Sequence, residues 1–503
     1  MQPHLKLESH TDMKKLMVFV LFMAAGMKLM AGGLVTNTNQ SAMFTRFQCR
    51  DATIDIDAAF YNPAGLTHLS RGFYLSVNNQ TMGQLKMITA EYENFGDEPK
   101  EFNARVSAPF FPGVYGVFKT GRFAFSAGVN PISGGGNSTS DQGLPALEMK
   151  VADVLPTLRN NLAAVDQTIE SVTGVDPSYS NIVSYDLDYT FEASSVYMGY
   201  QANLAFEVND YISVAAGVRL INAVNNFHGK IEGITVTGTT NTGTVTRDPA
   251  DYLRTVAISN DTLAATANLL ALADQIDIRT DIETHVRQKG IGFTPVLSFN
   301  YAVSLRTNIA VKLELKTKLE LETEVVDGKD AGGTFRDGNI VIADIPAMLS
   351  IGITRRPVNK ILIYSGIHYY FDKPIDFDGS ALQTIDMIDN NSYEFAIGTE
   401  YELNDAIRLS LGWLITRPGV NREYQSASRF KLRSNTLGGG LGIRLSQLID
   451  LNLGASYSLY KKDFREYERI PDDGVDPVPV TEYYDTRTWI LSVGVDFLFG
   501  ENR

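Results

Sequence analysis

Apolar side chains occupy every second position in several segments of this 503-residue sequence. Between Trp489 and Phe499 the odd-numbered residues are all large and apolar, whereas the even-numbered ones include Ser492 and Asp496. Successive side chains of a β-strand point to opposite sides, so a period of two indicates a strand with one apolar face. The segment from Asn308 to Thr323 has the same pattern and is predicted to be one long strand. Its apolar positions are Ile309, Val311, Leu313, Leu315, Leu319 and Leu321, and its ionic positions are Lys312, Glu314, Lys316, Lys318, Glu320 and Glu322.

The connections between the predicted strands alternate between short and long. Several short ones contain Gly, Asn or Asp, which favour tight turns. Short connections lie at 119–121, 209–210, 305–307, 356–360, 404–405 and 445–449, and long ones at 83–101, 131–184, 224–282, 325–340, 372–391, 416–429 and 463–484. This asymmetry is typical of bacterial outer-membrane barrels, which have short turns on one side and long loops on the other. We therefore predict an all-β transmembrane fold, an antiparallel outer-membrane β-barrel of about fourteen strands over residues 72–499.

A soluble β-sandwich would also contain alternating strands, with the apolar face turned inward. Strand length favours the membrane barrel, because the predicted strands reach the roughly ten residues that a tilted strand needs to cross a bilayer. The amino-terminal end favours it too, because it looks like an export signal. Lys14 and Lys15 precede an apolar run from Leu16 to Ala25, and small residues follow. Residues 1–31 are predicted to be this signal peptide.

A membrane anchor is the alternative for the same segment. Gly26 and Lys28 interrupt the apolar run at about half of the length that a spanning helix needs, which favours the signal peptide. The residues before Met13 are interpreted as an upstream mis-start or an extended leader.

The composition excludes several classes of protein. The sequence has 44 basic and 58 acidic residues, a net charge of −14, which opposes binding to nucleic acid phosphates. After the first forty residues, no apolar stretch approaches the roughly eighteen residues of a membrane-spanning helix. The single cysteine, Cys49, cannot form an intramolecular disulfide, and we expect it to be a packed, unreactive thiol.

Catalytic and metal-binding motifs are absent from the sequence. We find no His-Glu-x-x-His, Cys-x-x-Cys or Gly-x-Ser-x-Gly pattern and no phosphate loop. Ser365 and His368 share one predicted strand, but an odd spacing places them on opposite faces. We therefore predict no enzyme activity, no catalytic residues, no metal site and no cofactor, although a serine and histidine paired across strands is left open.

Two of the long connections, 131–184 and 224–282, contain helix-like segments. Leu144 to Val172 and Asp261 to Ile276 place apolar residues near helical spacing. We expect short helices in these extracellular loops, which either pack on the barrel rim or help to capture a ligand.

The segment at 32–71 lacks the alternation of a spanning strand and precedes the first one. It contains Arg50-Asp51-Ala52-Thr53 and then Asp57-Ala58-Ala59-Phe60-Tyr61-Asn62-Pro63-Ala64-Gly65-Leu66. These residues resemble the amino-terminal hatch signature of the FadL/TodX family of outer-membrane transport proteins for long-chain fatty acids and other hydrophobic compounds. The segments 344–352, 398–405 and 437–442 resemble later strands of the same family, so the similarity covers most of 40–499.

The resemblance implies a barrel whose lumen is plugged by a hatch at 32–71, with Asn62, Pro63, Ala64 and Gly65 as the hatch motif. It also implies passive uptake of a hydrophobic ligand, such as a fatty acid, with capture outside and sideways release into the bilayer. An apolar ligand gains nothing from an aqueous pore, because each exposed methylene costs about 0.8 kcal/mol. The partners implied are this ligand, outer-membrane lipid and lipopolysaccharide, and the barrel is expected to be a monomer. The alternatives are a porin for polar solutes, a structural or adhesive surface barrel, and a barrel esterase.

In the family, the wall opens at the third strand beside the hatch. Here that strand is predicted at about Arg122 to Asn130, and Gly128, Asn130 and Pro131 mark the corresponding lateral-gate region. We expect these residues to be the exit of the strand into its loop, with an interrupted strand as the alternative. The sequence departs from the family in lacking a Pro-Phe-Gly here and in having Phe47-Gln48-Cys49-Arg50 before the hatch motif. The lysines at 312, 316 and 318 are interpreted as members of ion pairs rather than as ligands of a carboxylate.

Overall fold

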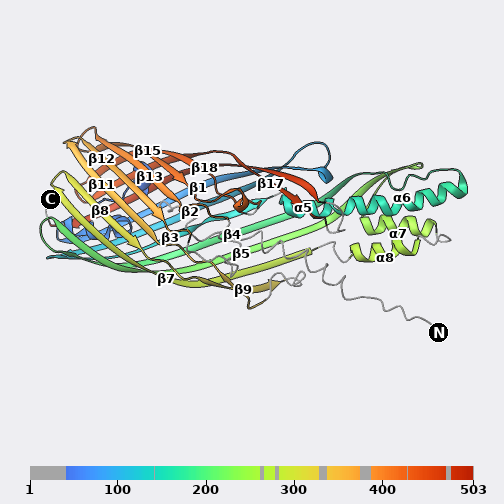
Figure 1. Cartoon of the computed structure of the whole chain (residues 1–503). Helices are drawn as coiled ribbons and strands as arrows, with labels where there is room; N and C mark the ends of the chain where they lie inside the picture. The colour runs from blue at the N-terminus through green and yellow to red at the C-terminus, as the bar shows by residue number, and fades with distance from the viewer. Residues whose placement is uncertain are drawn as a thin grey trace.

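The structure is a computed structural model that describes residues 41–140, 142–260, 266–277, 282–327, 337–373, 387–427, 429–471 and 477–501. The predicted signal peptide at 1–31 and the first part of the predicted hatch lie outside the described residues. One antiparallel sheet closes on itself and forms a long barrel (Figure 1).

Fourteen of the described strands form the closed ring, each paired with the next and the last paired with the first. They are β1 (Gly72–Tyr92), β2 (Lys100–Thr120), β3 (Phe123–Ser140), β4 (Ile182–Glu207), β5 (Ile212–Thr240), β7 (Ile282–Ser304), β8 (Thr307–Glu314), β11 (Met348–Val358), β12 (Ile361–Tyr370), β13 (Tyr393–Glu402), β14 (Ile407–Arg417), β15 (Ser434–Ser446), β16 (Ile449–Tyr460) and β18 (Val478–Gly500). β18 pairs with β1 from Gly72↔Gly500 to Tyr92↔Val480. The predicted fourteen-stranded barrel is confirmed, and the six short connections fall between the strands that they are predicted to join.

Four further strands extend this wall. β6 (Gly243–Arg247) pairs with β5, β9 (Glu320–Asp327) with β7, β10 (Ile340–Ile342) with β9, and β17 (Asp463–Arg469) with β18. They continue the long side of the barrel, where β1 to β5, β7 and β18 are 18 to 29 residues long. A bilayer takes up only about ten residues of a tilted strand, so this side rises well above the membrane.

The wall is apolar outside and polar inside. Trp489 and Leu491 of the last strand are 44% and 55% exposed, whereas Ser492 between Leu491 and Val493 is buried. Buried Asn203 and Arg219 point into the lumen. This arrangement is the reverse of a soluble sandwich, and it suits a surface that faces lipid rather than water. Among the described residues, no helix is both long and apolar enough to cross a membrane.

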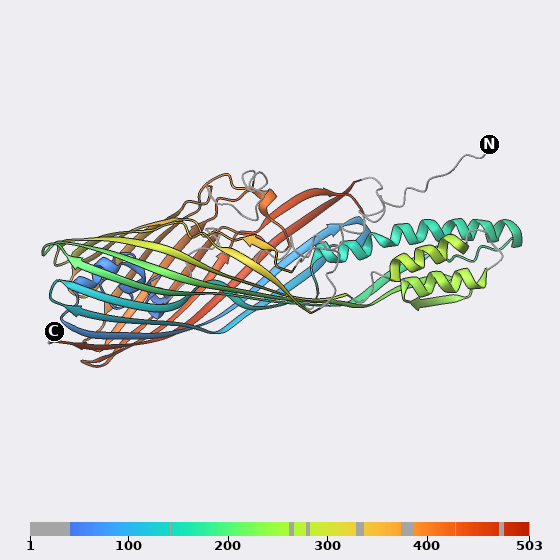
Figure 2. The same ribbon diagram turned by 90° about the horizontal axis from the view of Figure 1, so that it is seen from below.

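Helices gather beyond the tall rim, away from the end that carries the short turns (Figure 2). They are α5 (Pro145–Ala152), α6 (Val154–Thr173), α7 (Pro249–Ser259) and α8 (Thr266–Asp277). α6, α7 and α8 share a small core that contains Leu162, Leu253 and Leu269. The helices predicted within 144–172 and at the described part of 261–276 are present. α7 was not predicted, although Asp248 before Pro249 is a strong start signal whose carboxylate accepts from the amides of Ala250 and Asp251.

Several predicted boundaries are wrong. The connection predicted at 83–101 is only 93–99, because β1 continues to Tyr92 and β2 begins at Lys100. The strand predicted at Asn308–Thr323 breaks after Glu314, and the chain then steps to the inner side of the wall. Thr317 pairs there with Ile345, next to Gly292, which leaves room for it.

Leu319 and Leu321, predicted to face outward, are therefore buried inside against Tyr197. The period of two continues across the step, so the pattern alone does not reveal that the inner and outer faces have exchanged.

Candidate functional site

Residues 41–71, which we call the hatch segment, lie inside the ring at the end with the short turns (Figure 2). The segment contains two short α-helices and a 3₁₀ helix: α3 (Ala42–Phe47), α4 (Ala58–Tyr61) and η1 (Pro63–His68). Ser41 caps α3 by accepting from the amide of Phe44 at 3.0 Å, and its hydroxyl donates to Asp57 at 2.9 Å. Nearly all of the segment is buried, so it fills this part of the lumen.

Arg50 is the internal clamp of the hatch segment. Its guanidinium donates to both carboxylate oxygens of Asp57, at 2.9 and 2.7 Å, and to Asp55 at 2.7 Å. It also donates to the hydroxyl of Tyr364 on β12 at 2.7 Å. Burial opposes the charge, but the carboxylates of Asp57 and Asp55 hold the pKa of Arg50 well above its usual value. Arg50 therefore remains charged and ties the segment both to itself and to the wall.

These contacts of Arg50 predict that the Arg50→Met variant is much less stable than the unchanged chain. Removing one partner of a buried ion pair leaves the other charge uncompensated, so we expect the free energy of unfolding to fall by about 3–5 kcal/mol. Urea titration of the detergent-solubilised barrel measures this loss. Adding Asp57→Asn to Arg50→Met is expected to restore part of it, and an unchanged unfolding midpoint in Arg50→Met would contradict the role of Arg50.

Two ionic contacts join the hatch segment to β12, β13 and β14, which are short strands on the opposite side of the ring from β4 and β5. Arg46 binds Glu400 of β13 and donates to Ser410 of β14 at 2.7 Å. Asp51 lies 2.6 Å from His368 of β12, and the other ring nitrogen of His368 lies 2.9 Å from Glu394 of β13. Both ring nitrogens of His368 therefore have carboxylate partners.

Ser365 is on the opposite face of β12, as the odd spacing predicts, so it cannot pair with His368. The Cys49 thiol is buried beside the segment's own Asp51, and burial and that carboxylate raise its pKa well above the usual value, as expected of an unreactive thiol. Within the described ranges, no cluster of three or more acidic, His or Cys side chains is arranged to hold a metal.

The motif residues Asn62, Pro63, Ala64 and Gly65 dock the hatch segment on the taller wall. The Asn62 amide donates to the carbonyl of Thr53 at 2.9 Å and to Asn300 of β7 at 2.8 Å, and its oxygen accepts from Ser298 at 3.1 Å. Pro63 begins η1, where its missing N–H costs nothing. A side chain at position 65 would overlap the Asn62 amide and the Thr53 carbonyl, so the motif requires Gly65.

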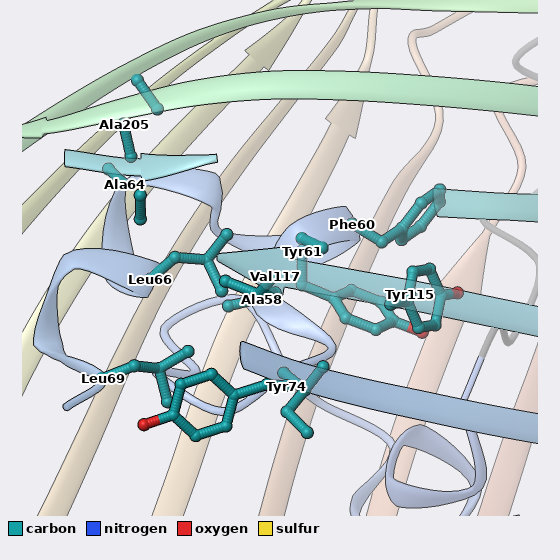
Figure 3. Close-up of a cluster of buried hydrophobic side chains, with 14 of the residues drawn as sticks. Ala58, Phe60, Tyr61, Ala64, Leu66, Leu69, Tyr74, Tyr115, Val117 and Ala205 are labelled. Atoms are coloured by element: carbon teal, nitrogen blue, oxygen red, sulfur yellow. The ribbon is translucent and has the colours of Figure 1, made fainter. Parts of the chain in front are cut away.

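On its other side the segment packs against the wall through apolar side chains. Phe60, Tyr61 and Leu66 meet Tyr115 and Val117 of β2 (Figure 3). Two cations lie over the Phe60 ring, with the Arg219 guanidinium 4.7 Å and the Lys312 ammonium 4.9 Å from the ring centroid.

Glu314 forms an ion pair with each of these cations, at 2.6 Å from Lys312 and 2.7 Å from Arg219. Lys316 pairs with Asp344 and Lys318 with Glu320, each at 2.6 Å. The interpretation of these three lysines as members of ion pairs is confirmed.

The ladder between β2 and β3 is interrupted above the hatch segment. Pairing runs from Thr120↔Phe123 to Val114↔Val129 and resumes only at Ser107↔Asn137. Residues 108–113 and 130–136 therefore have no partners in this ladder, and we call this stretch the β2–β3 break. Over the same residues β3 remains paired with β4, with two irregularities.

Prolines and glycines explain the break. Pro109 and Pro112 of β2 and Pro131 of β3 have no N–H to donate. Gly134 and Gly136 have φ angles of 111° and 76°, which a residue with a side chain rarely adopts. Within the break, Ile132 of β3 packs against the buried cluster that contains Phe60.

The expected exit of β3 into its loop at Asn130 is wrong, because β3 continues to Ser140. Gly128 is paired on both sides, and the interruption begins at Asn130. Sequence analysis missed the β2 half of the break, although two prolines three residues apart in Pro109-Phe110-Phe111-Pro112 are a clear signal against a continuous inner strand. Phe110, between the two prolines, is 72% exposed.

Comparisons with known proteins give a fold. No family model and no curated protein matches the sequence. Among solved structures, a FadL homologue from Pseudomonas aeruginosa is similar over 93% of this chain and 100% of its own, with a TM-score of 0.60 and 14% identity. This chain has the FadL fold. The toluene transporter TodX from Pseudomonas putida also matches, with a TM-score of 0.50, 11% identity and coverage of 91% and 98%.

A TodX monoaromatic hydrocarbon channel variant matches similarly, with a TM-score of 0.51, 12% identity and coverage of 91% and 98%. The predicted resemblance to the FadL/TodX family is thus confirmed at the level of the fold, a closed barrel of fourteen strands.

Proposed function

We propose that this FadL-type barrel lies in the bacterial outer membrane and takes up hydrophobic small molecules passively, long-chain fatty acids or other apolar compounds, with sideways release. The observation that carries the proposal is the position of the β2–β3 break directly beside the plugged lumen. Ile132 of the break and Phe60 of the hatch segment belong to one packed cluster. A molecule that descends the lumen thus meets the plug and the break together.

Solubility favours a sideways exit. Moving an apolar chain through water costs about 0.8 kcal/mol per methylene, so a sixteen-carbon chain avoids more than roughly 10 kcal/mol by passing directly into the bilayer. A straight aqueous path through the hatch would expose the apolar chain to water and would therefore incur this free-energy cost. Two of the structural relatives are a toluene transporter and a monoaromatic hydrocarbon channel, and the apolar cargo of those proteins supports the same class here.

The remaining features are consistent with this role. The ring closes within one chain, which supports a monomer. The apolar outer belt suits contact with membrane lipid, and the tall polar wall above it suits contact with lipopolysaccharide. Non-enzymatic transport needs no cofactor, and both ring nitrogens of His368, which lies beside the hatch segment, are occupied by Asp51 and Glu394.

Proteoliposomes test the proposal against a porin. The purified chain is reconstituted, and two rates are measured: swelling in small sugars and transfer of a fluorescent long-chain fatty acid into the vesicle membrane. We expect fast fatty acid transfer and no swelling above protein-free vesicles. Rapid swelling would assign the chain to the porins, and the absence of both activities would favour a structural or adhesive barrel.

A further inference from the structure

Three exposed cations lie together on the outer face of the wall. Arg433 directly precedes β15, Lys461 directly follows β16, and Arg487 lies on β18. The Lys461 amide donates to the Arg433 carbonyl at 2.8 Å, so these two residues face each other across the ladder. Arg487 pairs with Leu459, which makes it a diagonal neighbour of Lys461 at about 7–8 Å. We call Arg433, Lys461 and Arg487 the basic patch.

Alternation along the strands places the basic patch on the lipid-facing side. Arg433 and Arg487 each lie between two buried residues, and Lys461 is two residues beyond Leu459, which is 55% exposed. All three side chains therefore point away from the lumen.

The charges of the basic patch have no ion-pair partners. Like charges that face each other across a ladder destabilise it. Among the residues that the structure describes, none of these three side chains has a carboxylate within 4.0 Å. The nearby Asp485 of β18, two residues from Arg487, binds Lys462 instead, at 3.4 Å. An anion from outside the chain would relieve the repulsion.

A row of large apolar side chains lies below the basic patch on the same face. It crosses β13, β14, β15, β16 and β18, because the register pairs each member with the next. The row, each member of which is 41–52% exposed, consists of Ile397, Trp413, Leu437, Tyr457 and Trp489. Gly83 of β1 leaves room for the Trp489 ring, which an added Cβ would overlap. This apolar row contains both tryptophans of the chain, a residue type that gathers at membrane boundaries.

The basic patch lies at the outer boundary of the bilayer. β16 begins after a short turn and has twelve residues, from Ile449 to Tyr460, whereas a tilted strand needs about ten to cross. Lys461 therefore comes where β16 leaves the membrane on the side of the long loops. In an outer membrane, this side carries the phosphate groups of lipopolysaccharide.

The cations at a similar height on β5 and β7 are paired within the protein. Lys230 binds Glu232 at 2.7 Å, and Lys289 binds Glu324 at 2.9 Å. The basic patch differs from them in keeping its charges available. A capacity to bind anions is thus concentrated on the side of the barrel formed by β15, β16 and β18.

We propose that the basic patch and the apolar row bind one molecule of lipopolysaccharide, with its lipid A phosphates on the cations and its acyl chains on the row. Guanidinium and ammonium groups form charge-assisted hydrogen bonds with phosphate. The row spans five strands, about 19 Å at roughly 4.8 Å per strand, which suits a lipid with several chains. A lipid that lies along the wall needs this surface and no cavity. The inference rests on the outer-membrane orientation in the proposed function, and it concerns a fixed lipid partner instead of the transported cargo.

Binding of three lipids to the detergent-solubilised chain tests this site, with native mass spectrometry as the measurement. Lipid A with both phosphates has the charge and the chains, lipid A without phosphates has the chains alone, and phosphatidylglycerol has one phosphate and two chains. We expect intact lipid A to bind at least about tenfold more tightly than either of the others, a difference of about 1.4 kcal/mol.

Variants of the basic patch assign the effect to its cations. In Arg433→Gln/Lys461→Gln/Arg487→Gln, intact lipid A is expected to bind no more tightly than lipid A without phosphates. Arg433→Lys/Arg487→Lys is expected to keep most of the preference, because it keeps the charge. The single Arg433→Gln variant is expected to lose part of the preference, and it keeps the test valid if the triple variant does not fold.

A charge-matched control removes three cations from another part of the outer wall. Lys230→Gln/Arg287→Gln/Lys289→Gln changes the net charge by the same amount on β5 and β7. We expect this variant to bind intact lipid A as tightly as the unchanged chain does. An equal loss in the control and in the basic-patch variant would show that only overall charge matters, which would overturn the site.

The remaining outcomes separate this inference from the proposed function. Equal binding of lipid A with and without phosphates, or of phosphatidylglycerol and lipid A, would overturn the lipopolysaccharide site. Fatty acid transfer in phosphatidylcholine vesicles that lack lipid A is expected to be the same for the triple Gln variant and the unchanged chain. Absence of this transfer in the unchanged chain would overturn the proposed function, whatever the result with lipid A.

Discussion

Deleting residues 41–68 is expected to convert a barrel that conducts no ions into one that does. The fourteen strands pair with one another without help from this segment, so the ring can remain closed when it is absent. A barrel of this size whose lumen is not filled by side chains leaves an aqueous channel. Planar-bilayer recordings are expected to change from no measurable current to stepwise openings.

Folding and a milder variant control this experiment. The deleted barrel should still migrate as a compact species in unheated gel samples, which shows that the ring is intact. Arg46→Ala, which releases the contacts with Glu400 and Ser410, is expected to give brief openings instead of a permanent pore. A folded deletion variant that passes no current would show that the hatch segment is not what closes the lumen.

Replacing Gly134 and Gly136 by alanine is expected to reduce uptake of a hydrophobic molecule by about tenfold or more. Both glycines have positive φ, and an added Cβ would overlap the carbonyl oxygens of Ser195 and Ser107. Strain of about 1–3 kcal/mol at each position disfavours the kink, and 1.36 kcal/mol already corresponds to a tenfold change in rate. Uptake of labelled fatty acid by cells that express each variant at equal surface levels measures the effect.

Gly121→Ala is the matched control, because Gly121 also has positive φ but an added Cβ would meet no neighbouring atom. It lies in the short turn between the same two strands, β2 and β3. We expect its uptake to equal that of the unchanged chain. If Gly134→Ala/Gly136→Ala folds and transports normally, the β2–β3 break is not the exit.

The strands and short turns could be predicted because local rules determine them. Period-two patterns specify which residues share a face, and residues such as Asn404 and Gly121 specify tight turns. The hatch motif could be found because Asn62-Pro63-Ala64 is a continuous sequence signal. Its contacts with Ser298 and Asn300 could not, since those residues are more than 230 positions away.

The missed features depend on long-range geometry. The inward step before Leu319 preserves the alternation, so nothing in the pattern marks it. An interruption was considered only as the alternative and only on the third strand, whereas the break arises jointly from Pro109 and Pro112 on β2 and Gly134 on β3.

Photo-crosslinking with a fatty acid that carries a diazirine at the end of its tail tests sideways release most directly. The labelled peptides of the reconstituted chain are mapped by mass spectrometry. We predict labelling of residues 108–113 and 130–136, together with Ile132's neighbours in the hatch segment. Labelling that bypasses both halves of the break and follows the turn end of the barrel below the hatch segment would contradict the account.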